Sequence, residues 1–332
     1  MSFLNSSKNT VSSIAHKRIK PAIRTSRGLT LVELMVAVAV SMILFIGIAQ
    51  IFVANKRAYR LQDDNSHIQE NGRFATGMIT QDLRRAGYYG ANSDVLHIGG
   101  TQQIAIAANT CPNDNTWARM LLFPVAGKDN TNAGYACITA AEYNNGTDIL
   151  VTRYTNSVPV PAASMDPGRP YLRTSLFYGR LFLGAEEANA LNDLSSRPQV
   201  DQAIVARAYF VGPSGRTCPD GLGIPALFRK ELGAGGALVT QEIASNIENL
   251  QVQYGVDTTG DSNIDRYLNA NAVIDPTKIK AVRYWILVRA KCEQPPGTYT
   301  NNNPYVMGNV NFIPGDRYKR QLFTGTVSLR NQ

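Results

Sequence analysis

The residues of this 332-residue chain that could do chemistry are few, and the densest group of them lies in an oxygen-rich stretch. The stretch carries side-chain oxygens at its first, fifth, seventh and ninth positions, namely Asp257, Asp261, Asn263 and Asp265. With Gly260 at the fourth position it could wrap Ca²⁺, although Thr259 and Leu268 stand where calcium loops carry carboxylates. The alternative is a solvated hairpin turn in which Asp and Asn side chains bind their own backbone. Calcium is the one cofactor that the sequence suggests.

Groups for enzyme catalysis cannot be assembled from this sequence. Its histidines are His16, His67 and His97, and the HExxH, GxSxG and P-loop patterns are absent. Gly221-Leu222-Gly223 lacks the third glycine of a dinucleotide-binding loop. Because no base, nucleophile and orienting group stand out together, we expect a protein that is not an enzyme.

The four cysteines are Cys111, Cys137, Cys218 and Cys292, and all follow the most apolar part of the chain. An even number of cysteines without a CxxC pair indicates disulfides rather than zinc or redox chemistry. Of the three pairings that four cysteines allow, we favour Cys111–Cys137 and Cys218–Cys292. Closing the first loop would stabilise the fold by about 3 kcal/mol in the chain-entropy model.

One further carboxylate, Glu33, lies inside an apolar run of 26 residues at 29–54. As a helix this run spans about 39 Å, at about 1.5 Å per residue, which exceeds a hydrocarbon core of about 30 Å. We therefore predict that it crosses a membrane once. A charge inside such a segment is costly and usually has a partner, although a residue this near the interface can also snorkel.

Basic residues are concentrated before this run. Of the net charge of +8, six units lie in residues 1–28, which hold no Asp or Glu, and two lie on the other 304 residues. The asymmetry places the N-terminus in the cytoplasm and everything after residue 55 outside it. A nearly neutral remainder gives no electrostatic basis for binding nucleic acid.

Two common kinds of segment could explain the apolar run. A secretory signal peptide cut near Ala54 fits poorly, because its apolar region would be much longer than about 7–15 residues. A plain uncleaved anchor of a periplasmic binding or receptor protein fits the hydropathy.

A single helix can continue from Thr30 to Arg85, since no proline lies between Pro21 and Pro112. Apolar residues in its second half recur at helical spacing and predict one buried face, which comprises Leu61, Ile68, Ala75, Ile79, Leu83 and Ala86. Such a helix is about 84 Å long. We expect its first half to lie in a membrane or a filament core and its second half to pack on a head domain. Gly72 and Gly77 weaken it by about 1 kcal/mol each and favour local melting or close packing.

From Tyr88 onward the chain alternates short apolar stretches with Gly, Pro and Asn turns. The predicted strands are 102–107, 119–125, 147–154, 203–211, 226–231, 237–242, 250–257, 281–290 and 320–329. The stretches 109–116, 155–170 and 293–304 are expected to be surface loops. The pattern predicts an α+β fold in which a mostly antiparallel sheet packs on the second half of the long helix.

The residues around Glu33 resemble a known signal. Arg27-Gly28 followed by Leu29-Thr30-Leu31-Val32-Glu33-Leu34 resembles the type III signal of type IV prepilins, a basic leader that ends in Gly before an apolar run with Glu. The resemblance implies that prepilin peptidase cuts after Gly28 and methylates Leu29. Glu33 would then form an ion pair with the N-terminal amine of a neighbouring subunit in a filament core. This contact would set the register, because either charge left unpaired there is costly.

A second resemblance extends along the chain. Glu70–Ala75 (ENGRFA) and Asp82–Gly90 (DLRRAGYYG) are similar to two elements of the PilW family of minor pilins, and Ile243–Asp257 and Thr326–Asn331 also fit. At the end of the helix, Gly87 can take the left-handed cap. The resemblance implies a pilin-like fold with a leader at 1–28, a transmembrane helix at 29–54, an amphipathic continuation at 55–87 and a periplasmic β-rich head at 88–332.

The function that this resemblance implies is that of a minor pilin of a bacterial type IV pilus. It would be held in the inner membrane by one span and enter the pilus on assembly. Its partners would be prepilin peptidase, other minor pilins and the major pilin, in a complex that primes assembly at or near the tip, with a tip adhesin as a further partner. The J-type pseudopilin of type II secretion has a similar helix and signal and remains an alternative. Cleavage at Gly28 would distinguish both from the uncleaved anchor.

Overall fold

The computed structural model of the chain describes residues 28–91, 95–100, 110–176, 178–189, 199–297 and 299–331. The chain divides into two compact units, Met1–Ala58 and Tyr59–Gln332. The boundary falls inside the α-helix α1, Leu31–Arg85, so the predicted helix from Thr30 to Arg85 is confirmed to within one residue.

The second half of α1 is buried along the predicted face. Ile68, Ala75, Ile79 and Leu83 are at most 3% exposed, whereas Leu61 is only partly buried. Among them lies Gly72, where an added Cβ would overlap the ring of Phe323, so no larger residue fits this close approach. The helix ends where Gly87 adopts a φ of 76°, which is the predicted left-handed cap.

The described strands of the second unit lie in three sheets, and the longest of them is β6 with 18 residues. They are β1 Ile98–Gly99, β2 Val125–Lys128, β3 Ile149–Pro159, β4 Pro170–Thr174, β5 Gly179–Leu183, β6 Val200–Thr217, β7 Gly223–Leu232, β8 Leu238–Ser245, β9 Ile247–Val256, β10 Arg266–Asn269, β11 Ile279–Arg289, β12 Tyr305–Met307, β13 Val310–Phe312 and β14 Arg320–Ser328. The 3₁₀ turns are η1 Val95–His97, η2 Asn115–Arg119, η3 Ala162–Ser164, η4 Gly184–Asn189, η5 Ala234–Gly236, η6 Ala270–Ala272 and η7 Pro276–Lys278.

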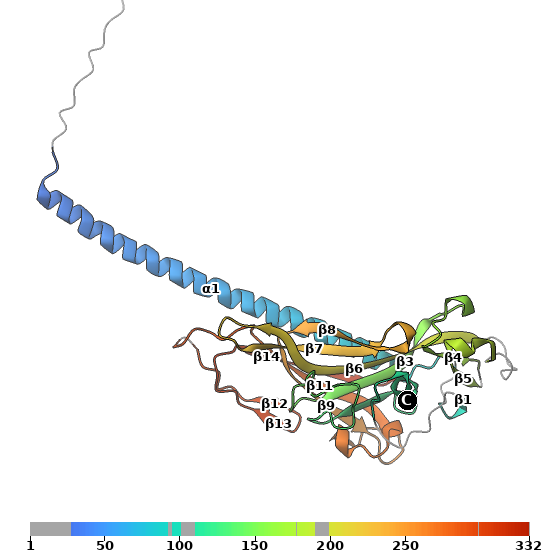
Figure 1. Cartoon of the computed structure of the whole chain (residues 1–332). Helices are drawn as coiled ribbons and strands as arrows, with labels where there is room; N and C mark the ends of the chain where they lie inside the picture. The colour runs from blue at the N-terminus through green and yellow to red at the C-terminus, as the bar shows by residue number, and fades with distance from the viewer. Residues whose placement is uncertain are drawn as a thin grey trace, which may run out of the picture. The chain divides into compact units, whose positions relative to one another are not determined.

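The larger sheet has the order β1-β5-β4-β6-β3-β2, with β7 and β8 continuing from β6. The second sheet has the order β10-β9-β11-β14, and β12 and β13 form a separate hairpin. Every described pair is antiparallel except the short parallel pair β1–β5. A long helix with mostly antiparallel sheets is the predicted α+β, pilin-like architecture (Figure 1).

The core lies where the second half of α1 meets both sheets. Ile79 and Leu83 of the helix share one buried cluster with Tyr209 of β6 and with Leu250 and Ile286 of β9 and β11. Strand β14 lies against this part of α1, where the Phe323 ring meets Gly72. The chain passes from the first sheet to the second at Asn246, the single residue between β8 and β9, which has a φ of 65°. Asn tolerates this left-handed conformation, and the two strands can therefore leave it in different directions.

Some strand predictions were wrong. Residues 119–125 do not form a strand, because Asp114 caps the turn η2 by accepting a hydrogen bond from the Thr116 amide, 2.8 Å away, and β2 begins only at Val125. The stretch 155–170 is not wholly a loop, since β3 continues to Pro159. Strands β1, β4, β5, β10, β12 and β13 were not predicted, and the predicted strand 102–107 lies outside the described residues. The other predicted strands each overlap an observed one.

Candidate processing and assembly site

The predicted cleavage point lies just outside the helix. Gly28 and Leu29 have no regular secondary structure, and α1 begins two residues after Leu29. The Leu29 side chain is 76% exposed, and apart from the chain neighbours of Gly28 no atom of the described residues lies within 4 Å of where a Gly28 Cβ would stand. Exposed backbone that is not held in a helix is the kind of segment that proteases accept. Residues 1–27, the remainder of the predicted leader, lie outside the described residues.

Glu33 has a local partner that sequence reasoning missed. Thr30 precedes the first helical residue, and its backbone N–H and its hydroxyl both donate to Glu33 Oε2 at 3.2 Å. In return, the Glu33 N–H donates to Thr30 Oγ1, also at 3.2 Å. This reciprocal pattern is a capping box, whose signature Thr-x-x-Glu is readable in the sequence at 30–33. In this structure Glu33 therefore accepts hydrogen bonds from donors at the start of α1 that have no acceptor within the helix.

The first half of α1 exposes an apolar surface. Its most apolar 18-residue window has a mean hydropathy of 2.6, with none of it buried, and the helix is long and apolar enough to span a membrane. Even the Ser41 hydroxyl donates within the helix, to the Ala37 carbonyl at 2.7 Å. Apolar surface of this extent is unfavourable in water and must be covered by lipid or by other helices.

The second half of α1 carries a buried carboxylate, Asp82, which is 1% exposed. Tyr154 of β3 donates to its Oδ1 at 2.8 Å, and Tyr209 of β6 donates to its Oδ2. Arg207 Nη1 supplies the opposite charge, also 2.8 Å from Oδ1. Burial, and then the Asp82 charge, raise the pKa of Tyr154 to about 12, so the phenol stays a donor. We call Asp82, Tyr154, Arg207 and Tyr209 the Asp82 cluster.

The Asp82 cluster continues onto β7. Arg207 Nε lies 3.0 Å from Glu231 Oε2, and Arg229 Nη2 lies 2.8 Å from Glu231 Oε1. The charges therefore alternate in sign from the helix across β6 to β7. This network binds the end of α1 to the first sheet and leaves its groups paired with one another, so we assign it a structural role. Sequence reasoning noted Asp82 only as part of a family element and did not identify it as buried.

Both predicted disulfides form. Cys111 and Cys137 have Cα atoms 5.4 Å apart, and Cys218 and Cys292 have Cα atoms 5.8 Å apart. The second bond connects the turn after β6 with the segment after β11, so it ties the two sheets together. All four cysteines therefore form disulfide bonds.

The oxygen-rich loop uses its carboxylates on its own backbone. Asp257 accepts from the amides of Gly260 and Ser262, and Asp265 accepts from the Thr258 and Thr259 amides. The amide bonds lower the pKa of the Asp257 carboxyl, and the Thr258 hydroxyl, which donates to Asp265 at 2.7 Å, together with the Thr258 and Thr259 amides lowers the pKa of the Asp265 carboxyl. Asp261 likewise accepts from Asn263, so the site residues of the sequence hypothesis bind one another and the loop as in an Asx-rich turn.

The carboxylates of this loop already accept hydrogen bonds from the loop's own amides. Within the described residues, no group of three or more His, Cys, Asp or Glu side chains could hold a metal. Calcium binding at this loop stays a prediction, and no function is derived from it.

Comparison with known proteins identifies two regions of the chain. Residues 208–331 match the family model of PilW, the type IV pilus-assembly protein W. Residues 23–49 match the prokaryotic N-terminal methylation motif, which contains Gly28, Leu29 and Glu33. No curated protein and no solved structure matches the chain.

The chain is therefore similar to the PilW family over 124 of its 332 residues and carries a prepilin methylation motif near its N-terminus, and the two matches together support a relationship to the minor pilins of type IV pili. The PilW match covers two of the four segments on which the resemblance was based, Ile243–Asp257 and Thr326–Asn331. The helix elements at 70–75 and 82–90 lie outside it.

Proposed function

Because a PilW domain follows a prepilin methylation motif, we propose that this chain is a minor pilin whose precursor is cut after Gly28 by prepilin peptidase and methylated at Leu29. The observation that carries the proposal is the position of the motif in the fold. The Gly28–Leu29 bond is exposed directly before a helix whose apolar surface is uncovered. Cutting there leaves the anchor helix in the mature protein.

The proposed topology follows from the charges. Six basic residues precede the apolar run, so the N-terminus stays in the cytoplasm and the single span leads to a periplasmic head. The two disulfides agree with this, since an oxidising compartment maintains them. After release from the inner membrane, the exposed apolar helix would pack against helices of other minor pilins and of the major pilin.

The proposed place in assembly is a complex of minor pilins that primes the pilus and sits at or near its tip, where an adhesin would be a further partner. The description of the matched family as a pilus-assembly protein supports this proposal. The J-type pseudopilin and the uncleaved anchor are the competing functions, and no observation in this structure favours either.

Mass spectrometry of the intact protein and of its N-terminal peptide, purified from native membranes, tests the proposal. The expected chain begins at Leu29 and carries one added methyl group. A Gly28→Leu variant should stay full length, while Gly47→Leu, which alters a glycine inside α1, should be cut normally. A wild-type chain that begins at Met1, or that is cut near Ala54, would overturn the proposal.

A further inference from the structure

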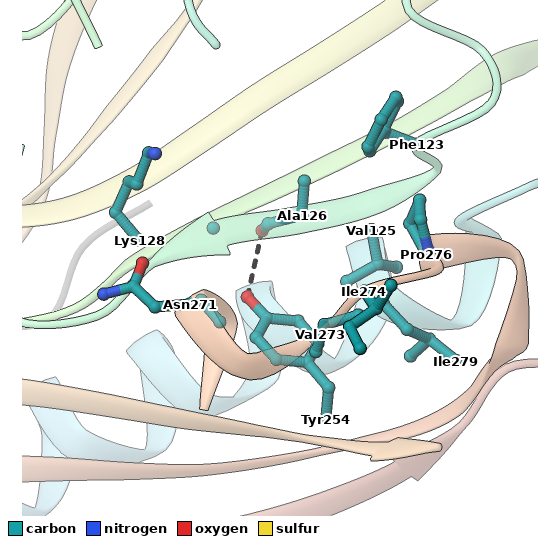
Figure 2. Close-up of a pocket in the computed structure, with 12 residues that line it drawn as sticks. Phe123, Val125, Ala126, Lys128, Tyr254, Asn271, Val273, Ile274, Pro276 and Ile279 are labelled. Atoms are coloured by element: carbon teal, nitrogen blue, oxygen red, sulfur yellow. Dashed lines mark hydrogen bonds between the residues drawn. The ribbon is translucent and has the colours of Figure 1, made fainter. Parts of the chain in front are cut away.

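The cleft between β2 and the segment that leads from η6 to β11 holds polar groups that already contact other groups of the head. Figure 2 shows the Tyr254 hydroxyl, which donates to the Ala126 carbonyl at 3.0 Å. The Lys128 ammonium lies 5.6 Å from the centre of the Tyr135 ring. The side of α1 that faces away from the core differs from this cleft, because it carries residues whose types the described fold does not explain.

The second half of α1 has an outer face opposite to its buried one. The buried residues recur at intervals of four, three, four and three, and they are Ile68, Gly72, Ala75, Ile79 and Asp82. Exposed residues follow the same spacing two positions later, and they are Glu70, Phe74, Gly77, Gln81 and Arg84. Two positions correspond to about 200° around a helix. We call these five exposed residues, together with the exposed Arg73, the outer face of α1.

The described fold gives no reason for a glycine at position 77. The helix continues beyond Gly77 to Arg85, and its φ is not positive. Apart from its chain neighbours and the adjacent helix backbone, nothing among the described residues lies within 4 Å of where a Gly77 Cβ would stand. Gly72, in contrast, is required by the Phe323 ring. Because glycine destabilises a helix relative to alanine, an exposed glycine here favours the close approach of another molecule.

Phe74 lies one turn before Gly77 on the same face and is 52% exposed. It follows residue 54, the end of the apolar run, by 20 positions, which places it outside the segment that a membrane would cover. An aromatic ring that stands half in water is stabilised by contact with another apolar surface. A large side chain beside a bare stretch of backbone is the knob and hollow by which two helices pack together.

The outer face of α1 is positively charged. Arg73 and Arg84 are exposed, and among the described residues no carboxylate lies within ion-pair distance of either guanidinium. The two arginines are 11 positions apart, which is about three turns and about 16 Å along a helix. The acidic residue of the face, Glu70, lies 4.0 Å from a ring nitrogen of His67. The face is therefore complementary to a helix that carries carboxylates.

From these observations we propose that the outer face of α1 binds a helix of another pilin, which packs a large apolar side chain over Gly77 and presents carboxylates to Arg73 and Arg84. The partner helix runs parallel to α1, because both chains are anchored through their N-terminal helices in one membrane. The inference rests on the proposed function and deepens it, since it extends the contact between pilins from the apolar half of α1 to the half that packs on the head.

Photo-crosslinking in the cells that make the protein tests the outer face. The full-length chain carries benzoylphenylalanine at Gln81 or, as a matched control, at Asn65, which is also exposed on α1 but lies about a third of a turn away from the line of Gly77. The product at Gln81 should be a helical peptide of another pilin with two Asp or Glu residues about 11 positions apart, which matches the spacing of the two arginines. The same peptide should be absent at Asn65.

Variants of the outer face separate packing from charge. Gly77→Leu should reduce the crosslinking yield at Gln81 at least tenfold, because the new side chain occupies the hollow. Its denaturant midpoint of unfolding should stay at or above the wild-type value, since leucine favours a helix more than glycine does. Asn65→Leu should leave the yield unchanged. Arg73→Glu should also reduce the yield at least tenfold, Arg73→Lys should retain it, and exchanging the partner's carboxylate for arginine should restore the yield of the Glu variant.

The proposal is overturned by no product at Gln81, or by products only with lipid, with the chain itself or with a protein that has no prepilin-like helix. A yield that is insensitive to both Gly77→Leu and Arg73→Glu would overturn it as well. A failure of the proposed function is seen separately, as an N-terminal mass that still begins at Met1.

Discussion

Arg207 on β6 pairs with Asp82 on α1 across 2.8 Å, and the two residues join the helix to the larger sheet in the buried core of the second unit. The pair is held from both sides, because Tyr154 donates to the same carboxylate and Glu231 pairs with the same guanidinium. A carboxylate that is 1% exposed is tolerated only because these partners are in place. The strongest effect of a single polar substitution in the helix is therefore expected here.

Asp82→Asn should lower the free energy of unfolding by about 2 kcal/mol, because Arg207 keeps only Glu231 as a charged partner and one of the two buried tyrosine hydroxyls loses its acceptor. The measurement is denaturant unfolding of the full-length protein in detergent, followed by the fluorescence of the buried Trp117. Asp63→Asn, at an exposed position of the same helix, should change stability by less than about 0.5 kcal/mol. A loss below about 1 kcal/mol for Asp82→Asn would refute the proposed structural role of the Asp82 cluster.

Gly77 within α1 and Gly87 at its C-terminal cap give a second test of stability, in which each substitution serves as the control for the other. Gly87 has a φ of 76°, and a Cβ there would lie 2.9 Å from the Asn331 carbonyl oxygen. Gly87→Ala should therefore destabilise the protein by about 1–2 kcal/mol. At Gly77 nothing lies within 4 Å, so Gly77→Ala should stabilise the helix by up to about 1 kcal/mol. The same unfolding assay compares the two, and effects of equal sign would contradict the explanation.

The two disulfides should differ in their contribution to stability. Their cysteines are 26 and 74 residues apart, and the chain-entropy model assigns the longer loop about 1 kcal/mol more stabilisation than the shorter one. Replacing Cys218 and Cys292 together by serine should therefore cost more than replacing Cys111 and Cys137. Unfolding of the two double variants decides the order, and the reverse order would show that local packing outweighs loop closure.

The sequence predicted those features of the fold that depend on residues close together in the chain. The buried face of Ile68, Ala75 and Ile79 followed from helical spacing alone, and the cap at Gly87 followed from residue type. Burial of Asp82 could not be predicted, because Tyr154, Arg207 and Tyr209 are 72 to 127 residues away and meet it only through the sheet.

The errors in the head have the same origin. The apolar run at 119–125 suggested a strand, but the cap at Asp114 and the proline at position 124 decided its conformation. Strand β4 begins at Pro170 and follows a Pro-rich stretch, so only its pairing with β5 and β6 identifies it. The candidate site could be read from the sequence because Gly28, Leu29 and Glu33 lie in one short motif, and cleavage and methylation there stay a prediction. Within that motif the capping box at 30–33 was not predicted, although Thr30 and Glu33 carry its sequence signature.

Stability should depend on pH through Asp148, whose carboxylate accepts from the Asn130 and Val252 amides at 2.8 and 2.7 Å. Burial raises its pKa from 3.8 to about 7. A folded-state pKa above the unfolded value means that the folded chain holds the proton more tightly. This stabilisation is complete below pH 3.8 and is lost as the pH rises through about 7.

Asp148→Asn has no proton to lose, so the decline in unfolding free energy between about pH 5 and about pH 7 should be smaller than in the wild type. Other titrating groups are common to both proteins and cancel in the comparison. Asp63→Asn should retain the wild-type slope. Equal slopes in the wild type and the Asp148 variant would exclude Asp148 as the source.

Two substitutions of Glu33 distinguish its role as a helix cap from the role of its negative charge. Glutamine can replace glutamate in a capping box, so Glu33→Gln should preserve the helix start that Thr30 and Glu33 form. Glu33→Ala removes both the cap and the charge. If the carboxylate pairs with the amine of a neighbouring subunit in an apolar core, either change leaves a buried ammonium unpaired, which is strongly destabilising.

We therefore expect both Glu33 variants to be cut after Gly28 but to enter pili at least tenfold less, since about 1.4 kcal/mol already corresponds to that factor. The measurement is the amount of the variant in sheared pili relative to membranes, with the N-terminal mass determined in each fraction. Thr30→Ala serves as the control, because it removes the cap and keeps the charge. Normal entry of Glu33→Gln together with poor entry of Thr30→Ala would mean that Glu33 acts through the helix start rather than through a neighbouring amine.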